Sequence, residues 1–502
     1  MTTEAIATAD PLVSELCDRR EELLILIDTD NKLGQRVAAE FERRKTVGCG
    51  ILVVQIGWHP AEVEHGLAAA FNEPQFRPQN VTIFIPEWHK LHPNAAPICA
   101  AINRAFQRYV SNLKTYARSA RTMLWNAIRQ AEFYPGSLRF AEMRGFAKPL
   151  GLPALILGAG PSLDQTLATI PADIRANAII IVCDTAALPL LLQRAIGAHF
   201  IASIDVGPRK AKAIRQLSNA CGSLNRTGAP GWKQSPILLT MSAASPAFSR
   251  AWRHDGAERA FVGWQSPASP IMPPLAKSPA RIESDSIREP LSCLNLAYHA
   301  AVHFGCNPIV LAGCDLALGT GADPAQTHVG GAVGHWGELG RPAAADLQQV
   351  EGLDGKRYGT IPSMIAIRSA LEQQIGEASG GSEKIETWNA TAAGALIYGA
   401  VRCDPDLSRV FQGGTDDAAA EESKMVSAIP KRPLSARTGT LESVLMHVAQ
   451  NIPREMVEMA AFSAIRERKV PKGEAESDAR RWVRKVLDYA VKAVQRRKAK
   501  LE

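Results

Sequence analysis

The sequence predicts an α/β protein with a Rossmann-like, mostly parallel sheet as its core, a smaller N-terminal α/β domain and a C-terminal helical tail. Three observations predict the core. Several short apolar runs look like buried strands, and they end near Leu157, Cys183, Ile204, Thr240, Val262 and Ala312. Helical stretches, including residues 291–304, fill several gaps between these runs, which indicates a parallel sheet covered on both faces. A glycine turn, Gly158-Ala-Gly160, directly follows the first run.

Composition divides the chain into four regions, which we predict at residues 1–148, 149–402, 403–440 and 441–502. The first holds two apolar strands, at residues 50–57 and 80–86, a stretch at 21–27 of helical or mixed character, and a long helical connector. The second is the alternating core. The third has the Pro, Gly and Glu content of a linker, and the fourth is basic and helical.

Length and composition restrict the class of protein. A chain of 502 residues is long enough for two to four domains. No apolar run reaches the roughly 18 residues of a membrane span, and the first residues lack the pattern of a secretory signal. The nine cysteines are scattered without a CxxC pair, so we expect buried thiols in a reducing cytoplasm and no metal site. The net charge of +7 is mild for this length and does not predict DNA binding.

The glycine turn is the strongest functional signal. Gly158 and Gly160 let the backbone approach a ligand closely, and Pro161 fits the first position of a helix. Unpaired N–H groups at a helix start favour an anion, so this turn predicts a phosphate or nucleotide site. A tight strand–helix turn without a ligand is the alternative.

A carboxylate after the next strand supports the nucleotide interpretation. Asp184 follows the run that ends at Cys183, roughly 20 positions after the glycines, where Rossmann-type folds hold a ribose. Leu163 stands where a third glycine of GxGxxG would be, which disfavours ordinary NAD binding. A single nucleotide, held differently, fits better.

The order of the motifs resembles a known family. The motifs are Gly158-Ala-Gly-Pro-Ser-Leu-Asp164, Cys183-Asp-Thr-Ala186, Ile204-Asp205, Leu311-Ala-Gly-Cys-Asp-Leu-Ala317 with Thr327-His328, Glu351-Gly352 to Thr360, and Asn389-Ala-Thr-Ala-Ala-Gly-Ala395. This order resembles the motility accessory factor (Maf) flagellin glycosyltransferases and the wider group around the 6-hydroxymethylpterin diphosphokinase MptE-like domain. The resemblance covers residues from about 150 to 400, and the Maf core is in turn similar to bacterial sialyltransferases.

The resemblance implies a donor, an acceptor and a set of site residues. The donor would be a CMP-activated nonulosonic sugar, and the acceptor a hydroxyl, on a protein such as flagellin. Gly158, Gly160 and Ser162 would hold the phosphate, and Asp184 and Thr185 would lie near the ribose or base. Asp205 and Asp315 would line the crevice at the carboxyl ends of their strands, and Asn389 and Thr391 would close the pocket.

Transfer of a sugar to a hydroxyl requires stabilisation of the leaving phosphate and a group that takes the acceptor proton. His328 is the candidate base, because it follows the Asp315 strand in a Gly-rich segment; Asp315 is the second catalytic candidate, and His335 is held in reserve. A surface role for His328 stays open. His299 and His303, four residues apart on a helix, lack a third ligand, so we expect a packing face.

Two other functions stay open. A diphosphokinase would use ATP with Mg²⁺ held by the aspartates, although the loop has no Lys like that of a P-loop. A non-catalytic nucleotide-binding module would tolerate replacement of His328 and Asp315. The last helix, residues 480–494, has apolar residues at helical spacing opposite a basic face, which either is solvated or contacts an acidic partner, a membrane surface or nucleic acid.

Overall fold

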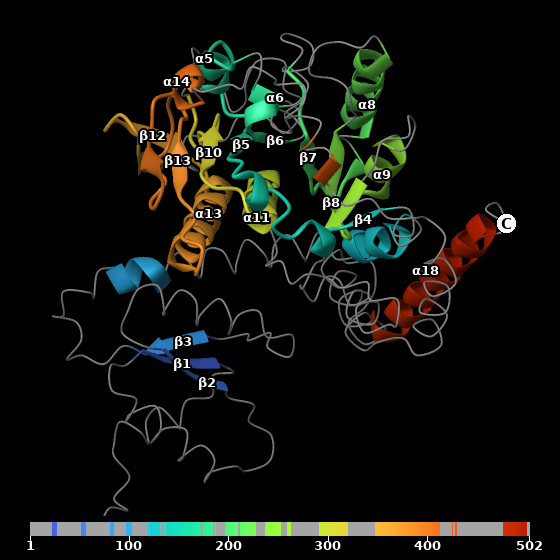
Figure 1. Ribbon diagram of the computed structural model, residues 1–502. Coiled ribbons are helices and arrows are strands. Elements are labelled where there is room, and N and C mark those ends of the chain that lie inside the picture. Colours follow the sequence, from blue (N-terminus) through green and yellow to red (C-terminus); the bar gives the residue numbers. More distant parts are fainter. Residues whose placement is uncertain are drawn as a thin grey trace, which may run out of the picture. The chain divides into compact units, whose positions relative to one another are not determined.

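The computed structural model divides the chain into two compact units, Met1–Lys114 and Thr115–Glu502, which we describe separately (Figure 1). Apart from a few single residues, the described ranges are 23–27, 52–56, 81–84, 97–102, 121–130, 137–171, 174–183, 196–208, 211–226, 236–252, 259–262, 291–319, 347–411 and 475–498. The division between the units falls inside the predicted helical connector. The predicted domain limits at residues 148, 402 and 440 remain predictions.

The first unit contains a three-stranded parallel sheet in the order β2-β1-β3. Its strands are β1 (Leu23–Ile27), β2 (Leu52–Ile56) and β3 (Val81–Phe84). The two predicted strands are confirmed. The helical or mixed character predicted for residues 21–27 is wrong, because this segment is the central strand. A short continuous apolar run fits a strand paired on both sides, and its leucines alone do not distinguish helix from strand.

The second unit is built on a nine-stranded sheet whose described strand pairs are all parallel. The order is β14-β13-β10-β5-β6-β7-β8-β9-β4. The strands are β4 (Leu138–Arg139), β5 (Ala154–Leu157), β6 (Ile179–Cys183), β7 (Phe200–Ser203), β8 (Ile237–Met241), β9 (Arg259–Val262), β10 (Ile309–Ala312), β13 (Thr387–Asn389) and β14 (Val401–Arg402). The predicted α/β, Rossmann-like class is confirmed, and each predicted strand end lies within about one residue of the observed one.

The strand order reverses next to β5. From β5 the chain proceeds outward through β6, β7, β8 and β9, and then returns to the other side of β5 with β10, β13 and β14. Leu157 pairs with Ala312 at the ends of β5 and β10, so the loops that follow these strands start side by side. Open parallel sheets leave a crevice for ligands outside the carboxyl ends at such a switch point.

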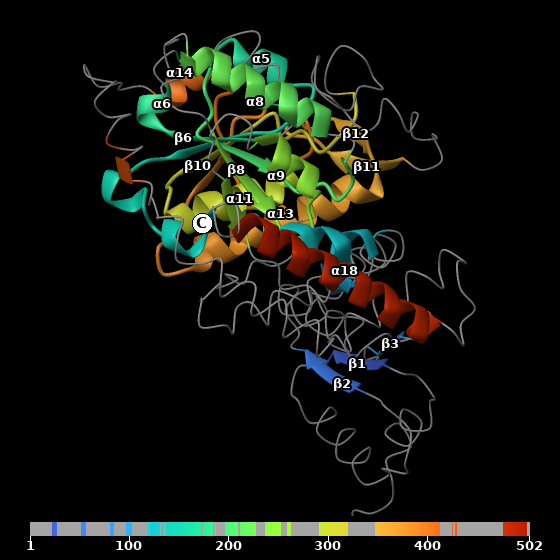
Figure 2. The same ribbon diagram turned by 90° about the vertical axis from the view of Figure 1, so that its right-hand side faces the viewer.

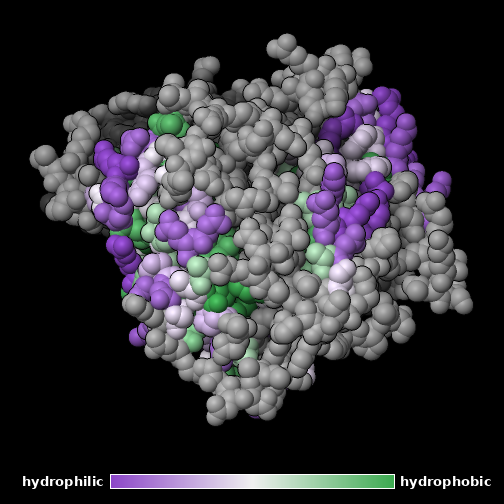
Figure 3. Space-filling view, turned by 90° about the horizontal axis from the view of Figure 1, so that it is seen from above, coloured by the Kyte–Doolittle hydropathy of each residue, from purple (hydrophilic) through white to green (hydrophobic). Residues whose placement is uncertain are grey.

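Helices cover the strands. α11 (Cys293–Phe304) packs on β5, β6, β7 and β10, and α13 (Pro362–Gly380) packs against α11. α8 (Ala211–Arg226) lies on the opposite side of the strands and contacts α9 (Pro246–Trp252) (Figure 2). Figure 3, which views the molecule from above, shows hydrophilic residues on both the left and the right of this face.

The ends of α11 follow from its sequence. The Ser292 side chain accepts a hydrogen bond from the Asn295 N–H at 3.2 Å, which satisfies one of the donors at the helix start. Gly305 ends the helix with φ of 80°, a backbone conformation that favours glycine. The predicted helix at residues 291–304 is therefore confirmed.

The centre of the sheet is the core of the second unit. Every residue of β5, β6, β7, β8 and β10 is buried, as expected for parallel strands that are covered on both faces. Three aromatic rings join the sheet to α11 and to the loop before β5. The Phe304 ring lies 4.7 Å from that of Phe200 and 5.0 Å from that of Phe146. This rigid core fixes the positions of the loops at both edges of the sheet.

The last described element is α18 (Ala475–Lys498), which confirms the predicted C-terminal helix. α18 contacts the helical segment 121–130, where the Arg121 guanidinium lies 4.7 Å from the centre of the Trp482 ring. Among the described residues, no helix combines the length and the apolar character needed to cross a bilayer.

Candidate functional site

The glycine loop after β5 packs directly on the backbone that follows β10. The Gly158 N–H donates to Ala312 O at 2.8 Å, and the Gly160 N–H donates to Gly313 O at 2.8 Å. These two hydrogen bonds continue the contact between β5 and β10 beyond the ends of the two strands. The loop is therefore held by main-chain contacts at the switch point, where the fold predicts a ligand.

Both glycines are required by this close approach. A Cβ atom on Gly160 would overlap Asp315 Oδ1 and come within 2.7 Å of Gly313 O. A Cβ atom on Gly158 would overlap Gly313 O, a backbone atom. Gly313 itself has φ of 62°, which lets the chain turn after β10. In the structure, these glycines thus allow the loop after β5 to contact the loop after β10.

Asp315 is the centre of the site. Its carboxylate is 2% exposed and accepts two hydrogen bonds from Ser162, from the N–H to Oδ2 at 2.9 Å and from the hydroxyl to Oδ1 at 2.6 Å. α5 (Leu163–Leu167) begins directly after Ser162, so Pro161 precedes the helix and the prediction that places Pro161 at its first position is wrong. The Leu163 N–H instead bonds to Gly160 O at 3.0 Å, which makes Pro161 and Ser162 part of a turn.

The Asp315 carboxylate occupies a position that the sequence assigned to a phosphate. An anion stabilised by a backbone N–H and a hydroxyl at the start of a helix is the predicted arrangement, but here the anion belongs to the protein. Ala159 is different, because its N–H has no hydrogen-bond partner among the described residues. The phosphate-binding roles of Gly158, Gly160 and Ser162 remain predictions.

A third segment, the turn after β13, completes the site. The Ala390 N–H donates to Leu311 O at 2.8 Å, and the Ala395 N–H donates to Asp315 O at 2.7 Å. Gly394, with φ of 136°, packs so closely on the Asp315 backbone that a Cβ atom would come within 2.5 Å of Asp315 O. The turn thus lies against both ends of the segment from Leu311 to Asp315.

Asn389 and Thr391 connect the turn to β10 through their side chains. The Cys314 N–H donates to Thr391 Oγ1 at 3.2 Å, and the Thr391 N–H donates to Asn389 Oδ1 at 3.0 Å. Asn389 is 1% exposed, and its Nδ2 donor has no hydrogen-bond partner among the residues that the structure describes. A buried amide donor without a partner costs about 1–3 kcal/mol, so this atom is a candidate ligand contact.

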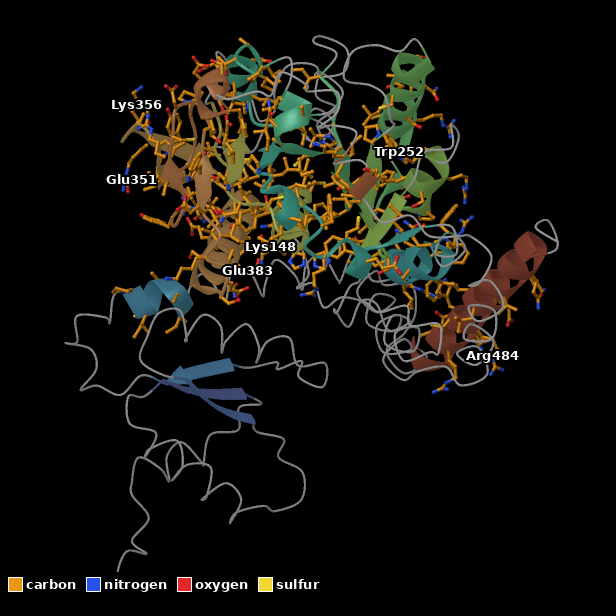
Figure 4. All side chains as sticks on the ribbon, in the orientation of Figure 1. Lys148, Trp252, Glu351, Lys356, Glu383 and Arg484 are labelled. Carbon is orange, nitrogen blue, oxygen red and sulfur yellow. The ribbon has the colours of Figure 1, made fainter. Side chains whose placement is uncertain are left out.

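The antiparallel pair β11 (Gln348–Glu351) and β12 (Arg357–Thr360) borders the same segment. The Thr360 hydroxyl donates to Leu316 O at 3.0 Å, and the Leu396 N–H donates to Glu351 O at 2.8 Å. Figure 4 shows Glu351 and Lys356 at the outer edge of this pair. The pair therefore bridges the residues after Asp315 and the turn after β13.

Two ionisable side chains near Asp315 keep their protons at neutral pH. Burial raises the pKa of the Cys314 thiol to about 12, and the neighbouring Asp315 carboxylate contributes in the same direction. Burial and a hydrogen bond to Asp354, at 2.9 Å, raise the pKa of Tyr358. Cys314 is thus a neutral packing residue and not a nucleophile.

Six of the residues predicted for the site come together at the switch point: Gly158, Gly160, Ser162, Asp315, Asn389 and Thr391. Asp205 follows β7, and β5 and β6 separate β7 from β10. At the usual inter-strand spacing, the strands β7 and β10 that precede Asp205 and Asp315 are about 14 Å apart. Four predicted residues lie outside the described residues: Asp184, Thr185, His328 and His335.

The structure adds residues that the sequence argument did not single out. Gly313 and Gly394 provide the close approach to Leu163 and to Asp315, and Cys314 supplies the N–H that binds Thr391. The two glycines were visible in the motifs Leu311–Ala317 and Asn389–Ala395. Which atoms they approach follows only from the strand order.

His299 and His303 form the packing face that we expected. The Phe140 ring stacks on His303 at 4.1 Å and on His299 at 5.8 Å, and His303 Nε2 lies 2.7 Å from Phe140 O. Burial, with the neighbouring His303 and Arg144, lowers the pKa of His299 to about 4. Within the described ranges, no group of three or more His, Cys, Asp or Glu side chains is arranged to hold a metal ion.

Comparison with known proteins agrees with this geometry. Residues 132–321 match the family model described as 6-hydroxymethylpterin diphosphokinase MptE-like. The match covers less than half of the chain, so it shows a similarity of this segment to the MptE-like family. The match contains β5 to β10, with the glycine loop and Asp315, so the resemblance found from the motifs is confirmed.

The fold of the chain is also similar to a solved structure. A Maf glycosyltransferase from Magnetospirillum magneticum AMB-1 aligns with a TM-score of 0.53 and 15% sequence identity, over 94% of this chain and 74% of that chain. At this identity the likeness concerns the fold alone. The search of curated proteins found no match.

Proposed function

We propose that this chain is a glycosyltransferase-like enzyme that transfers a nonulosonic, sialic-acid-like sugar from a CMP-activated donor to a hydroxyl acceptor. The observation that carries the proposal is the polar site at the switch point, where the buried Asn389 Nδ2 donor has no partner in the described part of the chain. The likeness of the fold to a protein described as a Maf glycosyltransferase supports the same class. A protein acceptor such as flagellin is part of the proposal.

The geometry suggests a division of roles within the site. Asn389 Nδ2 and the Ala159 N–H are donors that a nucleotide oxygen could accept from. Asp315 is a positioning residue, because both carboxylate oxygens are engaged by Ser162 and its side chain is buried. We therefore propose His328 as the base that takes the acceptor proton, and His335 as the alternative base. The role proposed for Asp315 is to hold the glycine loop in position.

The description of the matched family favours a second candidate, a diphosphokinase that uses ATP with Mg²⁺. Carboxylates that share one Mg²⁺ must approach it at about 2.1 Å. Asp205 and Asp315 follow strands that are separated by β5 and β6, about 14 Å apart by strand spacing, which disfavours a shared ion. This chemistry would require Asp184 and further ligands. The non-catalytic module is the third candidate.

Calorimetry with CMP and ATP, each with and without Mg²⁺, tests these candidates. The informative variant is Asn389→Asp, which keeps the acceptor for the Thr391 N–H and replaces the unpaired donor by a carboxylate oxygen. Asn219→Asp, at an exposed position of α8, is the matched control because it makes the same chemical change far from the switch point. Thermal unfolding shows whether each variant is folded.

We expect CMP to bind the original chain without Mg²⁺. Its affinity should be lower by about tenfold or more in Asn389→Asp and unchanged in Asn219→Asp. Binding of ATP only with Mg²⁺ would support the diphosphokinase instead. If neither nucleotide binds to the folded protein, both enzyme proposals are contradicted. The rate of sugar transfer by His328→Ala tests the assigned base separately. If this variant binds the nucleotide and transfers the sugar at the original rate, His328 is not the base.

A further inference from the structure

The helix α18 has two different faces. Ala479, Val483, Val486 and Leu487 are buried and recur at the spacing of one helix face. Arg481, Arg484 and Lys485 lie on the opposite face and are exposed. Figure 4 shows the Arg484 side chain on α18. The apolar face of the helix is therefore already used for packing within the protein.

The buried face is fixed to the sheet through the helical segment 121–130. The Arg121 guanidinium lies 3.4 Å from Asp478 Oδ2 and stacks over the Trp482 ring. Further along the same segment, Asn126 Nδ2 donates to Val206 O at 2.8 Å and to Ala243 O at 2.9 Å. These carbonyls belong to the loops after β7 and β8, so α18 is joined to the carboxyl edge of the sheet.

The exposed face carries positive charge. Arg481, Arg484 and Lys485 have no ion-pair partner within the part of the chain that the structure describes. Arg481 and Arg484 are three residues apart, so their guanidinium groups are neighbours on the helix surface. Asp488, one turn further, is the acidic residue on the same face.

We propose that this basic face is a docking surface for an acidic segment of another protein. Two guanidinium groups on neighbouring turns match carboxylates, because Arg binds a carboxylate with two parallel hydrogen bonds. The proposal does not depend on the reaction assigned above, since it rests on the charge and exposure of α18 alone.

Two observations favour a protein over the other anionic partners. An amphipathic helix binds a membrane by inserting its apolar face, and here that face is buried within the protein. Asp488 interrupts the basic face and would repel a continuous phosphate backbone, and Trp482 is covered by Arg121, which restricts its stacking on a base. An acidic segment with spaced carboxylates avoids both difficulties.

The test is fluorescence anisotropy of a labelled Asp/Glu-rich peptide with the full chain. The variant is Arg481→Glu/Arg484→Glu. The matched control is Lys212→Glu/Arg215→Glu, which reverses two exposed charges at the same spacing on α8 and changes the net charge equally. We expect the α18 variant to bind the peptide about tenfold more weakly and the α8 variant to bind within about twofold of the original chain.

Duplex DNA and phosphatidylserine vesicles are the competing probes. Tighter binding of either one, lost in the α18 variant, would overturn the proposal in favour of that partner. Equal weakening in both variants would show a response to net charge alone and would also overturn it. Failure of the original chain to bind the peptide would do the same.

Discussion

The two edges of the large sheet hold their loops by different means. At the carboxyl edge, the glycine loop contacts the Gly313 backbone and the Asp315 carboxylate directly, with no space for a Cβ atom at Gly158 or Gly160. At the amino edge, the loop before β5 is held on α11 by stacked side chains, Phe140 on His299 and His303. A contact between backbones tolerates no added atom, whereas stacked side chains can adjust. The edge predicted to bind a ligand is thus the more constrained one.

Gly160→Ala is expected to have the largest effect. The added methyl would overlap Asp315 Oδ1, and the Gly313 carbonyl limits movement away from it. We expect the free energy of unfolding to fall by about 4 kcal/mol, above the usual 1–3 kcal/mol of overpacking, because a backbone atom must move. Urea unfolding measures this change.

Gly376→Ala is the matched control for this glycine. Gly376 lies within α13, and a Cβ atom there would meet no atom within 4 Å. We expect this variant to be more stable by about 0.5–1 kcal/mol, since Ala restricts the unfolded chain. If both variants show the same stability, the carboxyl edge is not the rigid contact described above.

Replacement of Asp315 sharpens the comparison at the same edge. Asp315→Ala leaves the Ser162 N–H and hydroxyl without their acceptor in a buried site, so we expect a loss of about 3 kcal/mol. Asp315→Asn keeps one acceptor oxygen, and its amide can donate to the Ser162 hydroxyl, so a loss of about 1 kcal/mol is expected. Chemical denaturation of the two variants tests the difference, and equal losses would contradict the role assigned to these hydrogen bonds.

The amino edge is expected to respond to pH. The pKa of His299 is lowered to about 4, so between about pH 6.5 and pH 4 the unfolded chain binds a proton that the folded chain does not. Stability contributed by neutral His299 is therefore present above pH 6.5 and is lost as the pH falls toward 4. A shift of this size corresponds to about 3 kcal/mol, and partial exposure of the side chain reduces our expectation to about 2 kcal/mol.

The measurement is the urea midpoint of the original chain and of His299→Gln across this pH range. We expect the original chain to lose more stability on acidification than the variant, which cannot take up the proton at this position. Parallel pH curves for the two proteins would show that His299 is not responsible.

The smallest effect is expected for Phe140→Leu. The change retains an apolar side chain and removes the stacking on the two histidine rings, so a loss of about 1 kcal/mol is expected. Thermal unfolding measures it. A loss as large as that of Gly160→Ala would remove the distinction between the two edges.

The strands and their ends could be predicted because the central strands are continuous apolar runs that stop at polar or glycine residues. β1 could not, since a five-residue run of Leu and Ile fits either a strand or a buried helix. The glycine loop was found because Gly158 and Gly160 are local features of the sequence. The hydrogen bonds between Asp315 and Ser162 were not predicted, although both residues were expected in the site, because the two residues lie 153 positions apart along the chain.

The sequence by itself determined where the central strands of the large sheet lie, which of them precedes the glycine loop, and which polar residues follow their ends. The tertiary structure decided which of these residues meet. The chain returns past β5, so β10 lies directly beside β5, whereas β7 lies on the other side of β5 with β6 between them. Asp315, which follows β10, therefore contacts Ser162, and Asp205, which follows β7, lies farther from Ser162 along the edge of the sheet. The physical reason is that hydrophobic periodicity reports local burial, whereas strand order depends on how all strands and helices pack together.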